Sequence, residues 1–502
     1  MMLLADFLET ASRHWGKPAI QDVRRVLTCR QLVTLAAAIR RVILAETRRP
    51  NVGLLLPSTG AFAGCLYGSL WAGRTVVPLN FLLKPGELAT IVDDAGLDLI
   101  LTCEYFEKLA SQLPARALCL ERIGLRRRYL LARVLPWPRV PAVEDDALAV
   151  ILYTSGTTGT PRGVCLSHRN LHGNAMACIR HTQMTGEHEF LGVLPLFHSF
   201  GLTATLIAPT LLGATVRYHA RFQPSDVVHT LANTRTCVFM ATPSMYAALA
   251  KAKSVTPEVF QRLRLPISGG EPLAPAVFED YRARLGVTIL EGYGLTETSP
   301  VVSLNLPEAW RAGTVGRPLP GVELTARDED GRPLSADRNG ELWVRGPNVM
   351  RGYYHRPEET AAAVTPDGWL RTGDLGRIDG DGFVRITGRK KDVIIVGGEN
   401  VLPQEVEAVL EQHPAVAESS VVGAPDRTRG EVVVAFVVLR EGHDATPLEL
   451  REHCRAHLAG YKIPRQVMIE PDLPRGPTGK ILKRFLRERL ATQPACFATA
   501  DA

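Results

Sequence analysis

The chain has 502 residues, too many for a single hydrophobic core, so we expect at least two domains. Hydrophobic residues make up 46% and charged residues 22%, which is ordinary for a soluble globular protein. The net charge of +6 suits anionic small substrates but is too small to argue for nucleic acid.

The cysteines and the first residues predict the compartment. The nine cysteines contain no Cys-x-x-Cys pair and are odd in number, which favours reduced thiols over a disulfide framework. The start, "MMLLADFLETASRHWG", lacks a basic region and carries Asp6 and Glu9 where a signal peptide would be apolar. No uncharged apolar run reaches the roughly 18 residues of a spanning helix. We therefore expect a cytoplasmic protein.

Short apolar runs alternate with helical patterns through about the first 300 residues. The runs predicted to be buried strands are "NVGLLLP", "RTVVPLN", "LDLILTC", "LAVILYTSG" and "TCVFMATP". Helical patterns such as "PGELATIVDDAG" separate them. This alternation predicts a layered α/β domain that binds its ligands beyond the carboxyl ends of the strands.

The segment "LERIGLRRRYLLARVLPWPRV", Leu120 to Val140, mixes arginine with leucine, tyrosine and tryptophan. A connection packed on the protein surface is the favoured interpretation. A basic, apolar contact with a membrane surface, at the inner face, is the second hypothesis.

The pattern changes near Gly313 to short strands separated by turns, as in "GELWVRG" and "GRIDGDGFVRITG", which predicts a β-rich region. After Gly388 a strand and then a helix follow in "RKKDVIIVGGENVLPQEVEAVLEQHP", and the remaining residues predict a small α+β domain. The charged run "GRKKD" is the predicted junction.

The loop "YTSGTTGTPRG" combines features of a phosphate-binding loop. Its glycines let backbone amides approach an anion, its hydroxyls add donors, and Arg162 can donate to phosphate oxygens. The spacing of a Walker A loop is absent, and an ordinary solvated turn is an equal alternative for this loop alone.

Four further motifs carry groups suited to nucleotide chemistry. "EGYGLTETSP" offers a ring, Tyr293, and hard oxygen ligands for Mg²⁺, and "PISGGEPL" offers a glycine pair with a carboxylate. "GWLRTGDLG" places Asp374 after a turn, and "LPRGPTGKILKR" places Lys480 on a loop. Each alone has a plain structural alternative: a helix-capping turn, an Asx turn or a solvated lysine.

In this order, together with "LPLFHSFG" and "GRKKDVIIVGGENV", the motifs resemble the adenylate-forming superfamily of acyl-CoA synthetases, luciferases and adenylation domains. The resemblance runs from about Phe7 to Arg489 and implies ATP, Mg²⁺ and CoA. It implies an AMP-binding domain of residues 1–389, a hinge at 390–391 and a small mobile α+β domain of residues 392–502.

The resemblance also assigns roles to individual residues. The phosphate loop comprises Thr154, Ser155, Gly156, Thr157, Thr158, Gly159 and Arg162. The adenine frame comprises Gly269, Gly270, Glu271 and Tyr293; Gly294 flanks Tyr293, and Thr296 can hold a phosphate and a divalent cation together with Glu297. The ribose is gripped by Asp374 and Arg389, and Mg²⁺ is bound by Thr154 and Glu297. Lys480 bridges the acid and the α-phosphate, Lys391 is the hinge residue, and Gly397 and Gly398 line a pantetheine tunnel or form a plain hairpin turn.

The resemblance implies that His198 lies beside the acid carboxylate and gates the acyl tunnel. No carboxylate follows in "HSFGL", which argues against an amino acid substrate. The segments "GLTATLIAP" and "FMATPSMYAAL" are apolar and uncharged, which favours a medium- or long-chain fatty acid, with aryl acids as the alternative.

The resemblance implies that relatives serving an acyl carrier protein carry an insertion that hinders the domain rotation needed for CoA. No insertion interrupts "GRKKDVIIVGGENV", so the acyl acceptor is predicted to be CoA. The alternatives are transfer to an acyl carrier protein and a non-catalytic relative that only binds lipid or nucleotide. His453 and His457 have metal-ligand spacing, but a surface helix is the favoured interpretation.

Overall fold

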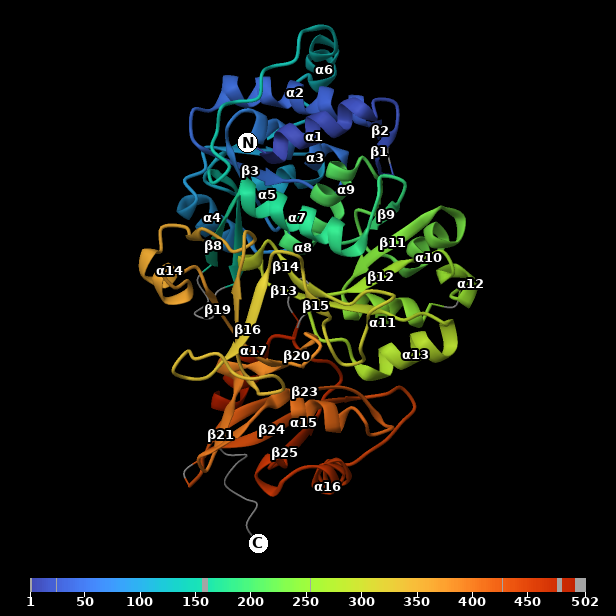
Figure 1. Cartoon of the computed structure of the whole chain (residues 1–502), viewed down its shortest axis with the longest axis vertical. Coiled ribbons are helices and arrows are strands. Elements are labelled where there is room, and N and C mark those ends of the chain that lie inside the picture. The colour runs from blue at the N-terminus through green and yellow to red at the C-terminus, as the bar shows by residue number, and fades with distance from the viewer. Residues whose placement is uncertain are drawn as a thin grey trace. The chain divides into compact units, whose positions relative to one another are not determined.

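The computed structural model describes residues 2–23, 25–155, 161–252, 254–426, 428–475 and 481–492, with only the backbone of Ser155 and Thr492. The chain forms two compact units (Figure 1). The first comprises Met1–Leu324 and Trp343–Arg371, and the second comprises Thr325–Leu342 and Thr372–Ala502. The motion about residues 390–391 stays a prediction.

The first unit contains two large sheets. The seven-stranded sheet has the order β18 (Gly352–Tyr353), β8 (Pro161–Ser167), β7 (Leu148–Ser155), β4 (Thr75–Pro78), β3 (Asn51–Leu55), β5 (Leu99–Thr102), β6 (Arg116–Cys119). The nine-stranded sheet has the order β15 (Arg317–Pro318), β14 (Val301–Leu304), β13 (Leu290–Gly294), β12 (Leu265–Ser268), β11 (Thr236–Ala241), β9 (Glu189–Gly192), β10 (Thr215–Tyr218), β1 (Pro18–Gln21), β2 (Val26–Thr28). The strands from β13 through β1 in that order run parallel to their neighbours.

Apolar side chains cover both faces of each sheet, because successive residues of a strand point to opposite faces. In β11, Val238 and Met240 join one core cluster while Phe239 and Ala241 join another. The second cluster is closed by α10 (Pro224–Asn233), α11 (Pro243–Ala250), α12 (Pro257–Phe260) and α13 (Pro275–Leu285), which lie together in Figure 1.

One large cluster joins the inner faces of the two sheets. Helices packed in it include α1 (Met2–Arg13), α2 (Cys29–Glu46), α3 (Gly60–Trp71), α7 (His168–Thr182) and α9 (Ala208–Leu212). The outer face of the seven-stranded sheet is covered by α4 (Pro85–Asp94) and α5 (Glu107–Ala110). The first unit is thus layered from helices and parallel strands, as predicted.

The remaining helices of the first unit lie at its edges and loops. They are α6 (Leu125–Val134), α8 (Ser199–Leu202) and α14 (Pro357–Ala363). A π-helical turn, Thr203–Ile207, joins α8 to α9.

The second unit has a sheet with the order β22 (Glu399–Val401), β21 (Ile394–Val396), β24 (Gly430–Leu439), β23 (Val416–Asp426), and β25 (Gln466–Ile469) pairs with β24. Alternate residues of β24 face α15 (Pro403–Leu410) and α16 (Pro447–His457) on one side and α17 (Lys483–Thr492) on the other. A four-stranded sheet has the order β16 (Glu323–Arg327), β17 (Gly340–Arg345), β19 (Leu370–Ile378), β20 (Val384–Arg389).

The predicted α/β class is confirmed, and the five quoted runs each contain a strand. The segment after Gly388 differs in one respect, since a hairpin of β21 and β22 stands where a single strand was predicted before α15. Within the described ranges, no helix is long and apolar enough to cross a lipid bilayer.

Candidate active site

The candidate residues of the first unit gather where parallel strands of the nine-stranded sheet end. Strands β9, β11, β12 and β13 run parallel, so the loops that follow their carboxyl ends meet at one edge. Ser199 Oγ lies 3.4 Å from Thr296 Oγ1, which joins the loop after β9 to the loop after β13. A Cβ atom on Gly269 would lie 3.2 Å from the Phe200 ring, so the loop after β12 is close as well.

Arg162 lies on a hairpin of the other sheet. Strands β7 and β8 pair with Thr154 opposite Arg162, so these two predicted phosphate ligands share one rung of the ladder. Arg162 Nε lies 2.9 Å from Glu359 Oε2 on α14, and its Cζ lies 5.7 Å from the centre of the Tyr353 ring. The cation that terminates the phosphate loop is therefore held by a carboxylate and an aromatic face.

Tyr353 connects Arg162 to the predicted magnesium ligand. Its hydroxyl donates to Glu297 Oε1 at 2.9 Å. Burial and the neighbouring Glu297 carboxylate raise the pKa of Tyr353, so the phenol stays protonated at neutral pH. The backbone carbonyl of Glu297 accepts from Met350 N–H at 2.8 Å, which fixes the turn that carries the carboxylate. Arg162, Tyr353 and Glu297 thus form one connected polar set.

His198 is partly buried and lies immediately before α8, with its ring 4.6 Å from that of Phe197. Burial lowers the pKa of His198 to about 4, so the imidazole is neutral at pH 7. Its Nε2 atom is buried and has no hydrogen-bond partner among the residues that the structure describes. A buried nitrogen without a hydrogen bond costs folding free energy. Such a nitrogen is typical of a binding site in which the ligand supplies the missing hydrogen-bond partner.

The predicted adenine frame has glycines for different physical reasons. Gly270 adopts a φ of +92°, which side chains rarely tolerate, and a Cβ there would meet open space. A Cβ on Gly294 would lie 2.0 Å from the Pro300 carbonyl oxygen, so packing alone demands glycine there. Tyr293 is half-buried against the main core cluster, and Glu271 follows β12. The nucleotide contacts of these residues stay predictions.

Asp374 and Arg389 form the candidate ribose grip in the second unit. They face each other across β19 and β20, and Arg389 Nε lies 2.8 Å from Asp374 Oδ1. The aspartate side chain is 4% exposed, whereas that of Arg389 is 39% exposed. Thr372 Oγ1 accepts from the Asp374 backbone amide at 3.0 Å, which fixes the turn. The two residues predicted to bind the ribose are thus in direct contact, and their binding of the ribose stays a prediction.

The hinge candidate and the glycine pair lie further along the second unit. Lys391 is in a short 3-10 turn, and burial, with Arg389 nearby, lowers its pKa. Gly397 and Gly398 form the two-residue turn between β21 and β22, with φ values of +60° and +91°. Positive φ at both positions is the requirement of a type I′ hairpin, so the turn itself explains both glycines.

Some predicted residues lie outside the described residues. These are Gly156, Thr157, Thr158 and Gly159 of the phosphate loop, and Lys480; for Ser155 only the backbone is described.

The two predicted metal ligands, Thr154 and Glu297, suit Mg²⁺ rather than a soft metal. A carboxylate and the Thr154 hydroxyl are hard oxygen ligands, and Mg²⁺ is commonly held by one or two such groups together with nucleotide phosphates. Among the residues that the structure describes, no group of three or more His, Cys, Asp or Glu side chains is arranged to hold a metal by itself. His453 and His457 accordingly lie on α16 with backbone carbonyl partners, at Val409 and His453.

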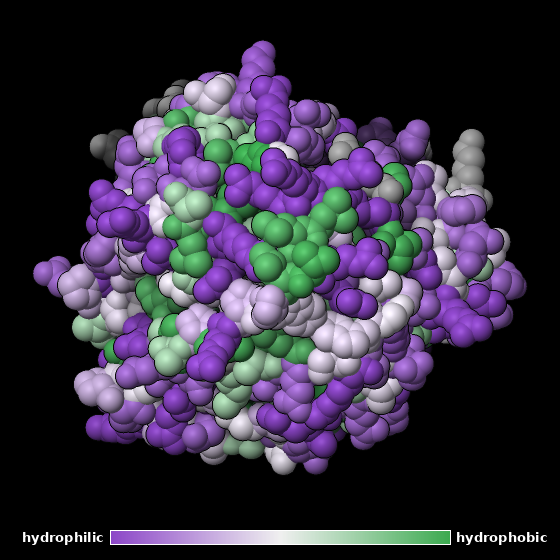
Figure 2. Space-filling model, turned by 90° about the horizontal axis from the view of Figure 1, so that it is seen from above, coloured by the Kyte–Doolittle hydropathy of each residue, from purple (hydrophilic) through white to green (hydrophobic). Residues whose placement is uncertain are grey.

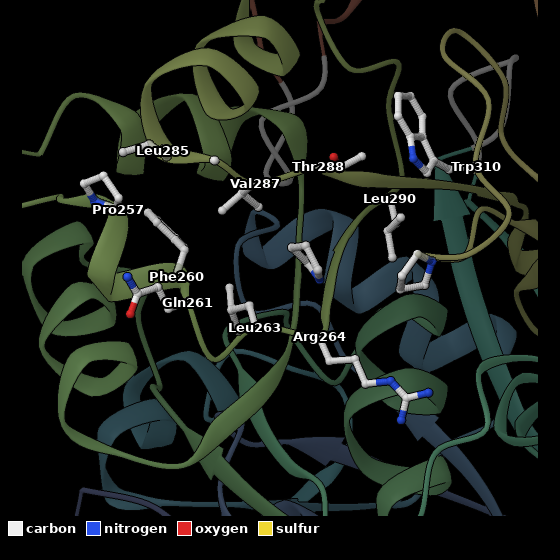
Figure 3. A pocket seen from close by; sticks show the side chains of 13 residues that line it. Pro257, Phe260, Gln261, Leu263, Arg264, Leu285, Val287, Thr288, Leu290 and Trp310 are labelled. Carbon is white, nitrogen blue, oxygen red and sulfur yellow. The ribbon is translucent and has the colours of Figure 1, made fainter.

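A separate pocket of about 460 Å³ lies near the amino ends of β12 and β13 (Figure 3). Arg264, Pro266, Thr288 and Leu290 line it, with Trp310 on its rim in the view shown. The candidate catalytic loops follow the opposite, carboxyl ends of these strands, so this pocket is distinct from them.

Sequence reasoning missed Tyr353 and Glu359. Both lie in "RGYYHRPEE", which contains two tyrosines and two glutamates beside arginines but resembles no phosphate-binding motif. Their role follows from β18, which pairs antiparallel with β8 and so carries Tyr353 to the hairpin of Arg162.

Arg162, the neutral imidazole of His198 and the Glu297 carboxylate are groups that suit an adenylate-forming enzyme. A family model described as "AMP-binding enzyme" matches residues 7–354, and one described as "AMP-binding enzyme C-terminal domain" matches residues 405–480. The chain belongs to this family, as the motifs indicated.

Three relatives illustrate the range of the family. The chain is 35% identical to a long-chain-fatty-acid–CoA ligase of Yersinia pestis, over 97% of this chain and 94% of the relative. It is also 35% identical to a feruloyl-CoA synthase of Amycolatopsis sp, over 96% of each chain. The crystal structure of ATP-bound MatB from Rhodopseudomonas palustris superposes with a TM-score of 0.90 at 30% identity, covering 97% of this chain and 98% of that one.

Proposed function

We propose that the protein is an ATP-dependent acid–CoA ligase that forms AMP and acts on a medium- or long-chain fatty acid. In the first half-reaction the acid carboxylate attacks the α-phosphate of ATP, which gives acyl-AMP and pyrophosphate. In the second, the CoA thiol attacks the acyl carbon and AMP leaves. The observation that carries the proposal is the connected set of Arg162, Tyr353 and Glu297 in a member of the AMP-binding family.

Arg162 and the loop before it bind the β- and γ-phosphates in this proposal. Phosphoryl transfer depends mainly on charge neutralisation and in-line orientation, which a fixed guanidinium and backbone amides supply. Glu297 and Thr154 hold Mg²⁺, which would neutralise the phosphate oxygens when bound. Tyr353 positions the Glu297 carboxylate through the 2.9 Å hydrogen bond.

His198 orients the acid. Because burial keeps the imidazole neutral, its ring nitrogen can hydrogen-bond the acid without an added positive charge. Asp374 and Arg389 bind the ribose hydroxyls, since a buried carboxylate beside a donor fits a diol.

The small domain acts in both half-reactions. Lys480 neutralises the acid and the α-phosphate during adenylation, and a rotation at Lys391 then ends this step. The hairpin turn of Gly397 and Gly398 presents a thin backbone to the pantetheine arm in the second step.

A fatty acid is the favoured substrate because the segment after His198 is buried and uncharged, and its threonine hydroxyls are already hydrogen-bonded. Residues from Gly201 through Pro209 are buried and carry no charge. Its two threonines are satisfied internally: Thr203 donates to the Ser299 carbonyl at 2.9 Å and Thr205 to that of Gly201 at 2.7 Å. An aryl acid is the second candidate, which the 35% identity to a feruloyl-CoA synthase favours.

The test is pyrophosphate release with ATP, Mg²⁺ and a panel of acids, with and without CoA. We expect release with fatty acids of eight or more carbons, and a thioester once CoA is added. Release only with aryl acids would establish the second candidate. A thioester on an acyl carrier protein but not on CoA would change the acceptor, and no release with any acid would overturn the enzyme assignment. We also propose that the enzyme is cytoplasmic.

A further inference from the structure

Helix α6, Leu125–Val134, has an unusual distribution of apolar residues between its two faces. Leu125 and Tyr129 pack against the main core cluster, and Ala132 is fully buried. These positions are spaced i, i+4 and i+7, so they form the inner face of the helix. The inner face alone accounts for the docking of α6 onto the first unit.

The outer face of α6 is also apolar. Leu130 and Leu131 are each 51% exposed and Val134 is 78% exposed. Both leucines lie one turn before Val134, so the three side chains share one solvent-facing surface. Leu135, 39% exposed, extends it. Figure 2, which views the molecule from the end where α6 lies in Figure 1, shows green side chains grouped among purple ones.

Arginines surround this apolar face. Residues 120–140 contain six arginines and one glutamate, a net charge of +5 in a chain whose total is +6. Four of the arginines lie on α6 itself, at positions 126, 127, 128 and 133, and all four are exposed. Arg122 is paired with Glu107 at 2.7 Å, but no ion pair with a carboxylate is recorded for the four helix arginines within the described part of the chain.

The segment is held firmly enough to present this surface. After the helix, the Trp137 ring packs edge-on against Trp15 and Trp71, with ring centres 4.8 and 6.4 Å apart. Trp71 Nε1 donates to the Arg139 carbonyl at 3.3 Å. The exposed leucines therefore lie on an anchored helix and not on a loose connection.

We propose that α6 binds the surface of an anionic lipid bilayer. Leu130, Leu131 and Val134 enter the boundary between headgroups and acyl chains, while the flanking arginines bind lipid phosphates. Charge complementarity selects this partner, because exposed apolar side chains within a cationic rim match an apolar layer beneath a negative surface. The proposal stands on α6 alone and does not depend on the ligase activity.

The experiment is cosedimentation of the full chain with vesicles, either of phosphatidylcholine alone or with about 30% phosphatidylglycerol. We expect binding to the anionic vesicles that weakens as salt shortens the Debye length from about 30 Å to about 8 Å. The Arg126→Gln/Arg127→Gln variant should bind about 25-fold more weakly, since each arginine contributes roughly fivefold. Leu130→Ser/Leu131→Ser/Val134→Ser should lower binding at least about tenfold.

The matched control carries Arg332→Gln, Arg338→Gln and Leu448→Ser, exposed residues of the second unit, and should bind like the unchanged chain. All variants should keep their thermal unfolding midpoint to within about 2 °C, because the altered side chains are exposed. Equal binding to neutral and anionic vesicles, or unchanged binding of the two α6 variants, would overturn the proposal. So would capture of an acidic carrier protein through α6 in the absence of vesicle binding.

Discussion

The candidate groups of the two units are assembled in different ways. In the first unit, Arg162, Glu297 and Tyr353 come from three distant segments that only the tertiary fold brings together. In the second unit, Asp374 and Arg389 face each other across neighbouring antiparallel strands. The group in the first unit is therefore sensitive to packing throughout that unit, whereas the pair in the second unit depends on a local strand pairing.

The largest expected effect separates the two half-reactions. Lys480→Ala should slow adenylation about 10²- to 10³-fold, because a charge that neutralises the transition state is lost. Thioester formation from supplied acyl-AMP should fall less than about fivefold, since the lysine acts only in the first step. Single-turnover assays of each step measure this. Lys483→Ala, which removes an ion pair with Glu407, is the control and should spare both steps; equal losses for Lys480→Ala in both steps would contradict the separation.

The buried histidines of the first unit predict a pH-dependent stability. Burial lowers the pKa values of His198 and His168 to about 4, so the unfolded chain binds more protons than the folded one at mildly acidic pH. The free energy of unfolding should therefore be highest above pH 6.5. It should fall by about 3 kcal/mol per histidine as the pH is lowered from 6.5 towards 4. His198→Gln and His168→Gln should each flatten this slope in urea titrations.

Activity distinguishes the two histidines. Only His198→Gln should impair acid activation, because His168 begins α7 and has no role in the proposed site. An equal loss of activity in both variants would make the effect of His198 structural.

A smaller effect is expected from the ribose grip. Asp374→Asn should raise the KM for ATP about 10- to 100-fold, because Arg389 loses its charged partner and the diol loses an acceptor. Initial rates at varied ATP measure it. Glu323→Gln, which breaks an exposed pair with Arg345, is the matched control and should change KM less than twofold. An unchanged KM in Asp374→Asn would remove this pair from nucleotide binding.

The smallest effect tests the hairpin turn. Gly397→Ala should cost about 1 kcal/mol of stability, because alanine resists the φ of +60°. Gly397→Asn should cost less, since asparagine tolerates this region. If the turn lines the CoA path, both variants slow thioester formation; recovery of that step in Gly397→Asn would leave the turn with a purely conformational role.

Much of the fold was predictable because it rests on local patterns. The buried strands β3, β4, β5, β7 and β11 follow from short apolar runs, and α4 from its period. The Asp374 and Arg389 pair was recognisable for a similar reason, since both belong to motifs that keep their order along the chain. Their direct contact still required the register of β19 and β20.

Tyr353 could not have been identified in this way. Tyr353 and Tyr354 are adjacent, yet the Tyr353 hydroxyl donates to Glu297 whereas that of Tyr354 accepts from Asn51 at 3.0 Å. Tyr353 ends β18 and Tyr354 begins the turn after it, so the choice between them depends on how β18 pairs with β8. Glu359 depends in turn on the packing of α14, which lies almost 200 residues from Arg162 in sequence.

The ion pair of Arg162 and Glu359 makes the glutamate an internal competitor for any anion that Arg162 binds. A phosphate arriving at Arg162 must share the guanidinium with Glu359 or displace it, which lowers affinity for substrate and departing product alike. Arginine suits this exchange, because its planar fork can keep Nε on the carboxylate while its other edge turns to phosphate. A lysine ammonium also has three donors, but it acts as a point charge without two opposed edges. If Arg162 binds phosphate as proposed, its pair with Glu359 would weaken that binding and speed the release of pyrophosphate.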